Sequence, residues 1–311
     1  MARQSNSARF GVTRRSFATT AAAAGLLAGA APFSILRAQS APLKVGVLLP
    51  RSGAQASIGQ DCQRGVEIAP AIFKQIGMPE LAIMNADTET NVEVARSRAE
   101  KLINDGAQLL VGAFDSGQST AIAQVAEQKG IPFVINIAAA PAITEQGYAY
   151  VFRNFPTAGM IVTDMLLLQK EVFAYVKATP KKMVLMHVND TYGTAVLGGI
   201  KALIAGVEKA YPGRNVATNQ VYTFEALLIV ADAYRRAKST DPSALAEALR
   251  ASDITDNVTI GRVAFNAKGQ NESLRCAAAQ NRNGRLVVVA PRSAANGEPI
   301  WPIRPWDQKA T

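Results

Sequence analysis

The residues FDSGQS, at 114–119, combine types that can bind an anion. They follow the apolar stretch AQLLVGAF and open a helical pattern. The first N–H groups of a helix have no acceptor within it, and the positive end of the helix dipole favours negative charge. Ser116 adds a hydroxyl donor. The types and their place therefore suit a carboxylate, while the simpler interpretation is that Ser116 caps the helix, and the two roles are compatible.

Other chemistry finds less support in the residues. Ser116, His187 and Asp190 are a serine, a histidine and an acid, but their order and spacing match no nucleophile-elbow pattern. His187 is the only histidine and ends an apolar stretch, which is more typical of a structural imidazole than of a base. One histidine and two distant cysteines offer a transition metal little to bind. No phosphate-binding glycine motif follows any expected strand. These observations predict a non-enzyme that needs no cofactor or metal.

The elements that must position these residues begin at Leu43. Four apolar stretches predict strands: LKVGVLLP, LAIMNAD, AQLLVGAF and IPFVINIA. Helical patterns separate them, over about 61–77, from the expected N-cap Asn91 to Gly106, and over about 117–130. Because parallel neighbours need crossover helices, this alternation predicts an α/β fold with a doubly wound parallel sheet.

In such a sheet, ligands bind outside the carboxyl ends of the strands. The loops that matter are therefore 51–60, 87–91, 114–119 and 137–142. The acids Asp87 and Glu89 are more typical of a solvated loop than of a catalytic pair.

The second half of the chain begins another unit, with a strand at 181–188 and a helix from about Thr194. Further helices are expected over 219–237 and in DPSALAEALRAS, where Asp241 is the N-cap and Pro242 lies in the first turn. Extended stretches follow, GRVAFNAKGQ, SLRCAAAQ and RLVVVAP, with Asn283-Gly284 as the turn of a hairpin. The last residues read as an irregular tail.

The first 40 residues contain five arginines and no acid, and Thr13-Arg14-Arg15-Ser16-Phe17 is typical of a twin-arginine export signal. We expect cleavage ahead of Ala41; the alternative is an N-terminal membrane anchor. Removing this segment lowers the formal charge from +9 to +4. The remaining Lys and Arg are scattered among acids, which argues against nucleic acid as a partner.

Export predicts an oxidising periplasm, where cysteines can pair. The two cysteines are Cys62 and Cys276. Their separation in sequence leaves both a disulfide and two buried free thiols open.

Several long motifs resemble the type I periplasmic solute-binding proteins of the leucine/isoleucine/valine-binding kind, which serve ABC importers. The motifs are VGVLLPRSGAQASIGQDCQRGVEIA, DTETNVEVARSRAEKLINDGAQLLVGAFDSGQS, GIPFVINIAAAPAITEQGYAYVFRNFPTAGM, HVNDTYGTAVLGGIK, and YTFEALLIVADAYRRAKSTDPSALAEALRAS followed by VAFNAKGQ. The resemblance implies two Rossmann-like lobes joined by crossing strands, with the ligand in the cleft.

The resemblance also implies the domain organisation. Residues 1–40 are the signal, 41–155 with about 216–290 form the first lobe, about 156–215 are a remnant of the second lobe, and 291–311 are the tail. In the family, further strand and helix units follow the one that opens at 181, whereas here Ile204 runs straight into 205–214. Two or three units of about 30 residues are thus absent, so we expect a truncated second lobe.

The ligand-binding residues that the resemblance implies are Ser116, Gly117, Gln118, Ile137, Ala139, Ile58 and Tyr192. The first three hold a carboxylate, the backbone of Ile137 lies nearby, and Tyr192 closes from the second lobe. Ala139 stands where amino-acid binders often have a hydroxyl, and Ile58 where some members stack an aromatic ring. The family's acidic partner for an amino group falls in the absent region. A carboxylate with an apolar or aromatic body therefore suits the site as well as leucine does.

These features predict an exported solute-binding subunit of an ABC importer that binds a branched-chain amino acid or a related small carboxylate. Its partner is the permease, which recognises the closed form of the two lobes. Two alternatives stay open. One is a shortened family member with weak or no ligand binding, and the other is a ligand-sensing subunit for a signalling partner.

Overall fold

The computed structural model describes residues 41–179, 218–255, 262–282 and 285–302. The expected export signal, the unit at 181–217 and the last nine residues of the tail, 303–311, lie outside these residues. So do His187, Asp190, Tyr192 and the turn at Asn283-Gly284. Among the described helices, none is long and apolar enough to cross a membrane.

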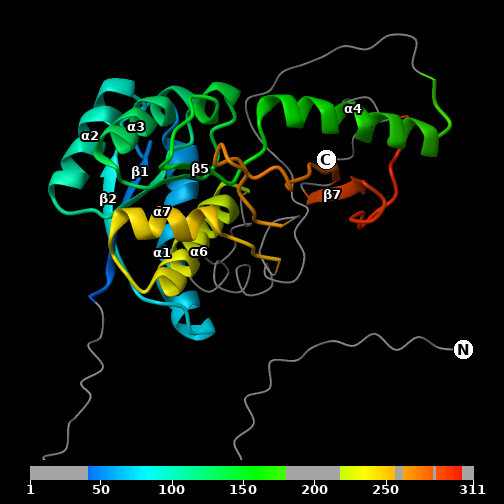
Figure 1. Cartoon of the computed structure of the whole chain (residues 1–311). Coiled ribbons are helices and arrows are strands. Elements are labelled where there is room, and N and C mark those ends of the chain that lie inside the picture. Colours follow the sequence, from blue (N-terminus) through cyan, green and yellow to red (C-terminus); the bar gives the residue numbers. More distant parts are fainter. Residues whose placement is uncertain (1–40, 180–217, 256–261, 283–284, 303–311) are drawn as a thin grey trace, which may run out of the picture. The chain divides into compact units, whose positions relative to one another are not determined.

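Five parallel strands form the central sheet, in the order β2-β1-β3-β4-β5 (Figure 1). Their bounds are β1 Leu43–Leu49, β2 Leu81–Asp87, β3 Leu109–Gly112, β4 Phe133–Ile135 and β5 Val151–Arg153. The expected α/β fold with a parallel sheet is confirmed. Strand β5 was not predicted, because three buried residues in VFRNF are too few to show a strand period.

Helices cover both faces of this sheet. The helices α1 (Ala56–Ile76) and α6 (Thr218–Ala237) lie on one face, and α2 (Val92–Asn104) and α3 (Ser116–Lys129) lie on the other (Figure 1). Neighbouring residues of a strand point to opposite faces. Val47 accordingly packs in the α1/α6 layer and Leu48 in the α2/α3 layer. Burial of both faces explains why the strands are nearly continuous apolar runs.

Helices α1 and α6 touch closely although about 160 residues separate them in sequence. A Cβ on Gly65 of α1 would lie 2.4 Å from the carbonyl oxygen of Gln220, so a glycine is needed for this approach. Phe73 and Phe224 pack nearby with ring centroids 5.8 Å apart. Helix α6, from the second half of the chain, is thus part of the same hydrophobic core as α1.

Most helix ends fall where the sequence predicts. Asn91 accepts hydrogen bonds from the N–H groups of Glu93 and Val94, and Asp241 caps α7 (Pro242–Arg250). Gly77 and Gly130 end α1 and α3 in the left-handed conformation. The expected start of α1 at residue 61 is wrong, since the helix begins at Ala56.

A close contact explains that early start of α1. A Cβ on Gly59 would lie 2.0 Å from the carbonyl oxygen of Pro50, so the first turn packs directly on the end of β1. The small and polar residues of this turn hid the helical period.

Residues 269–271, which we call the return segment, pair with the outer edge of β5 and so continue the sheet. Arg153 N–H donates to the Gly269 carbonyl at 2.7 Å, and Asn271 N–H donates to the Arg153 carbonyl at 3.0 Å. Gly269 has φ +71°, and a Cβ there would lie 1.9 Å from the carbonyl oxygen of Val151. Residues 269–271 therefore fix the outer edge of β5.

The remaining described elements are α4 (Ala158–Tyr175) and the strands β6 (Ala278–Arg282) and β7 (Arg285–Ala290). The predicted antiparallel pairing is confirmed, with Arg282 opposite Arg285. Phe173 of α4 packs edge-on against Trp301. The boundaries of the lobes stay a prediction.

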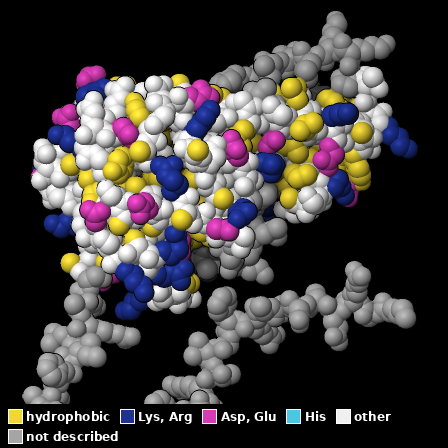
Figure 2. All heavy atoms as spheres, viewed as in Figure 1, with side chains coloured by type: hydrophobic (Ala, Val, Ile, Leu, Met, Phe, Trp, Pro, Cys, Tyr) yellow, Lys and Arg dark blue, Asp and Glu magenta, His cyan; other side chains and the backbone are white. Residues whose placement is uncertain are grey.

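Charged side chains lie on the surface in mixed groups. On the face shown in Figure 2, Lys and Arg are interspersed with Asp and Glu. This agrees with the scattered charges of the sequence.

Gly269→Ala should lower the free energy of unfolding by about 3 kcal/mol or more, because it adds overpacking to the left-handed strain of an L residue. Gly77→Ala is the matched control: its φ is +72° but its Cβ would meet nothing within 4 Å. The control should cost only about 1–2 kcal/mol. Urea unfolding measures both, and equal losses would contradict the edge contact at β5.

Candidate functional site

The start of α3 leaves two backbone donors at the carboxyl edge of the sheet. Asp115 is the N-cap, and its carboxylate accepts from Gln118 N–H at 3.0 Å. Ser119 N–H donates to the Asp115 carbonyl at 2.9 Å. Within the described residues, the N–H groups of Ser116 and Gly117 have no recorded acceptor. The interpretation that Ser116 caps the helix is thus wrong, because the neighbouring aspartate does so.

The hydroxyl of Ser116 joins two loops. Its Oγ accepts from the N–H of Ala140, 3.3 Å away, in the loop after β4. An accepting hydroxyl still carries one O–H to donate. Gly117 is exposed, so its backbone is open to a ligand.

Gln118 is buried, unlike Ser116 and Gly117. Its side chain is 1% exposed and accepts a short hydrogen bond from the Thr88 hydroxyl. Its Nε2 donates to Gln55 Oε1 at 3.4 Å, and Gln55 Nε2 donates in turn to Asp115 Oδ2 at 3.1 Å. The bond from Gln118 N–H to Asp115 closes a ring of Gln55, Asp115 and Gln118, to which Thr88 is attached, and this group ties together the loops after β1, β2 and β3. We call this set, Gln55, Thr88, Asp115 and Gln118, the loop ring.

A second brace comes from Asp87, at the end of β2. Its Oδ1 accepts from the N–H groups of Arg51, Ser52 and Glu89 at 2.9, 3.2 and 2.9 Å. Burial alone would raise the pKa of this carboxyl, but the hydrogen bonds outweigh it and the pKa lies below its usual value. Asp87 is only partly buried, as expected of an acid next to a loop, but it also has a structural role that was not predicted, since it holds the loop after β1.

The other expected site residues lie at the same edge of the sheet. Ile137 is 6% exposed and belongs to the core. Ala139 is half-buried, and its carbonyl accepts from Ala158 N–H at 2.9 Å. Ile58 is half-buried in the first turn of α1 rather than in a loop. Because β1, β3 and β4 are parallel neighbours, the structure brings these residues and Ser116 to one edge.

Sequence reasoning missed Arg153, the last residue of β5. Its side chain is fully buried. It donates to the carbonyls of Ala140 and Ala138 at 2.5 and 3.3 Å, to Thr144 Oγ1 at 2.7 Å, and to Gln270 Oε1 at 2.5 Å. Burial lowers the pKa of Arg153 to about 10, an effect that Glu145 opposes, and the guanidinium stays charged at neutral pH. An arginine amid the apolar residues of a strand was the available signal.

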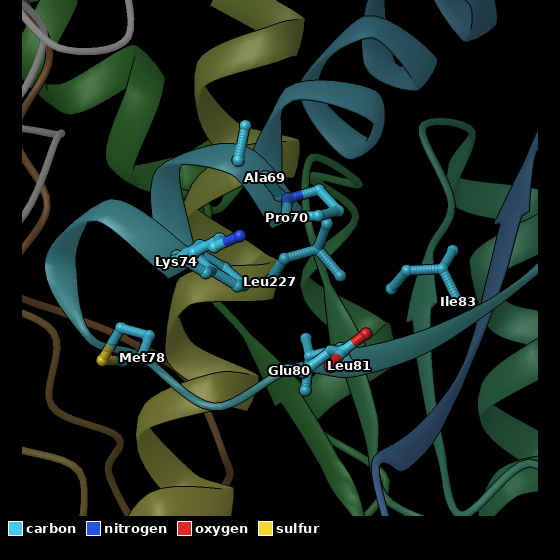
Figure 3. Close-up of a pocket in the computed structure, with 10 residues that line it drawn as sticks. Ala69, Pro70, Lys74, Met78, Glu80, Leu81, Ile83 and Leu227 are labelled. Atoms are coloured by element: carbon cyan, nitrogen blue, oxygen red, sulfur yellow. The ribbon is translucent and has the colours of Figure 1, made fainter.

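Two cavities lie apart from the start of α3. One, of about 500 Å³, opens between α1, α6 and the beginning of β2 (Figure 3). It is lined by apolar side chains such as Leu81 and Leu227, with Lys74 and Glu80 beside them (Figure 3). Leu81 begins β2, so this cavity lies away from the carboxyl edge.

The other cavity, of about 440 Å³, borders the first turns of α4 and residues 272–275. Its lining includes Thr157 and Gly159. These residues flank Ala158, whose N–H donates to the Ala139 carbonyl.

Both cysteines are free thiols, so the disulfide left open by the sequence is absent. Burial raises the pKa of Cys62 to about 12, although hydrogen bonds with Thr223 and Asn136 oppose it. Burial, with the negative charge of Asp164, raises the pKa of Cys276 to about 12. Among the residues that the structure describes, no group of three metal-ligating side chains occurs.

Alkylation with iodoacetamide at pH 8 should therefore leave Cys62 unmodified in the native protein and label both thiols in guanidinium without reductant. The unfolded thiols titrate near the usual value of 9.0 and the folded ones near 12. Intact mass spectrometry counts the labelled thiols, and resistance to labelling in guanidinium would reveal a disulfide instead.

Because the thiols of the unfolded chain lose their protons at lower pH than those of the folded protein, the free energy of unfolding should fall as pH rises from about 9 to 12.

Comparison with known proteins shows which family the sequence matches. A family model described as "Periplasmic binding protein" matches residues 42–206. The Leu/Ile/Val-binding protein homolog 7 of Brucella suis biovar 1 (strain 1330) is 31% identical over 208 residues, covering 62% of this chain and 50% of the relative. The chain thus spans about half the length of the curated relatives it matches.

Solved structures share the fold. The branched-chain amino acid transporter substrate binding protein LivJ from Streptococcus pneumoniae, in complex with isoleucine, has a TM-score of 0.64 at 14% identity. The match covers 79% of this chain and 97% of that one. An ABC transporter solute binding protein from R. palustris, in complex with benzoate, has a TM-score of 0.59 at 18% identity, covering 80% and 95%. At these identities the likeness concerns the fold alone.

Proposed function

The chain belongs to the periplasmic binding protein family, and we propose that it serves as the solute-binding subunit of an ABC importer. Its ligand is a branched-chain amino acid or a related small carboxylate. Its partner is a permease, its location is the periplasm, and its export uses the twin-arginine segment at residues 13–17. Like the family's other solute-binding proteins, it performs no reaction on the ligand.

One observation supports this proposal: the start of α3 leaves donors available to a carboxylate. They are the N–H groups of Ser116 and Gly117 and the Ser116 hydroxyl, which sits beside the loop after β4. The positive end of α3 adds to the attraction. Gln118 belongs to the site as the residue that fixes this turn through the loop ring.

The apolar part of the ligand would lie against Ile58, Ile137 and Ala139. The half-buried isoleucine at 58 and the methyl group at 139 present no polar atom, so they suit an aliphatic or aromatic body. The relatives with solved structures include one with isoleucine and one with benzoate, which match these two kinds of body. Tyr192, outside the described residues, would contact the ligand from the second lobe.

An internal gap in the sequence favours a second candidate function. Because the family's strand and helix units after Ile204 are absent from the sequence, the second candidate is a shortened member that binds weakly or not at all. Ligand binding to the purified protein separates the two. Co-purification with a signalling protein instead of a permease would support the ligand-sensing alternative.

Thermal unfolding with leucine, isoleucine, valine and benzoate tests the proposal. A ligand that binds the native state raises the melting temperature by mass action, and at 100 times its Kd it stabilises by about 2.7 kcal/mol. We expect at least one of the four to raise the melting temperature at millimolar concentration. No shift with any of them would favour the shortened, non-binding member.

Ser116→Ala should weaken the binding of that ligand about tenfold or more, because it removes a hydrogen bond to a charged group. Ser97→Ala on α2 is the matched control, since Ser97 is exposed and its hydroxyl bonds only the Val94 carbonyl in the described structure. Isothermal titration calorimetry measures both variants. Unchanged affinity in Ser116→Ala would mean that the carboxylate lies elsewhere.

A further inference from the structure

Arg153 is a buried cation surrounded by neutral acceptors. Its four hydrogen bonds reach two backbone carbonyls, a threonine hydroxyl and a glutamine oxygen. Within the described part of the chain, no ion pair includes it. Glu145 influences its titration, but that carboxylate is exposed, and solvent and salt weaken an exposed counter-charge. A buried charge without a close counter-ion is costly, so an anion nearby would be favoured.

The guanidinium contacts the loop after β4, which contributes Ile137 and Ala139 to the candidate site. It holds the carbonyls of Ala138 and Ala140, the two residues that flank Ala139. In a planar trans peptide the N–H points opposite to the C=O. The Ala139 N–H therefore points away from Arg153, and within the described residues no acceptor is recorded for it.

The same loop is coupled to α3. Ala140 donates its N–H to Ser116 Oγ and its carbonyl accepts from Arg153. The carbonyl and the N–H of Ala140 belong to different peptide groups, so Arg153 acts on the serine hydroxyl by holding Ala140 in place. The Ala140 carbonyl shares its peptide group with the nitrogen of Pro141, which has no N–H. This peptide group therefore accepts from the arginine but offers no donor of its own.

We propose that Arg153 is a positioning residue that aims the loop after β4 and supplies the buried positive charge that makes this site select an anionic ligand over its neutral counterpart. It acts through residues 138–140 and Ser116 without touching the ligand. This inference rests on the proposed function, because it concerns the same site. It identifies the ligand class as a carboxylate.

The test compares each carboxylate with its neutral amide: benzoate with benzamide, and leucine, isoleucine and valine each with the corresponding amino-acid amide. Calorimetry gives the ratio of affinities for whichever pair the wild-type protein binds. Two unit charges about 10 Å apart in an effective dielectric of about 20 interact enough to change an affinity by about tenfold. Arg153→Gln should therefore lower the carboxylate-to-amide ratio about tenfold. A merely structural role would weaken both ligands alike and leave the ratio unchanged, which would overturn the inference.

Three further variants make the result decisive. Arg153→Lys keeps the charge and should restore most of the ratio. Thr144→Asp places a carboxylate beside the guanidinium, so it should lower the ratio with the arginine still present, even if Arg153→Gln does not fold. Arg262→Gln, on an exposed arginine paired with Asp253, removes the same charge elsewhere and should leave the ratio unchanged.

The outcomes separate this inference from the proposed function. If the wild-type protein binds none of leucine, isoleucine, valine and benzoate, the proposed function fails and the inference fails with it. If the wild-type protein binds a carboxylate but Arg153→Gln and Thr144→Asp both keep its ratio, only the inference fails. A wild-type ratio that collapses in 0.5 M salt would also overturn it, because salt screens exposed charges far more than buried ones.

Discussion

The candidate site depends on the loop ring and on Asp87, which hold the ends of three strands together. Parallel strands deliver their loops to one edge of the sheet but do not fix the conformation of those loops. Here the carboxylate of Asp115 both caps α3 and accepts from Gln55, while Gln118 connects the same turn to Thr88. Each polar group so used is satisfied inside the protein. The N–H groups of Ser116 and Gly117, at the end of this arrangement, are the ones left for a ligand.

On the opposite side of the site, Arg153 and the return segment hold the loop after β4 in place. Gly269 permits a backbone contact with β5 that any side chain would prevent. Gln270 then reaches the guanidinium, whose other nitrogens hold the loop after β4. A segment more than 100 residues later in the chain thereby controls the position of Ala139. The contacts that fix the fold of this region consequently also fix the position of the buried charge of Arg153.

Sequence reasoning predicted the parts of this structure that depend on local pattern. The alternation of apolar strands and amphipathic helices, the caps at Asn91 and Asp241, and the glycine stops of α1 and α3 all follow from residue type and period. It did not predict β5 or the early start of α1, because a three-residue strand and a turn packed on Pro50 carry no period. The loop ring and the structural roles of Asp87 and Arg153 were missed, since a polar side chain after a strand looks the same whether it faces water or a buried acceptor. The resemblance supplied Ser116, Gly117, Ile137 and Ala139 as candidates, and the structure added the contacts that position them.

The central claim is that a ligand carboxylate binds at the start of α3. The most direct measurement is the ¹H–¹⁵N amide spectrum of the mature protein during titration with benzoate and with leucine. With the ligand that binds, the largest shifts should fall on the amides of Ser116, Gly117 and Ala139. Shifts centred on the cavity at Leu81 and Leu227, or no shifts at saturating concentration of either compound, would contradict the claim.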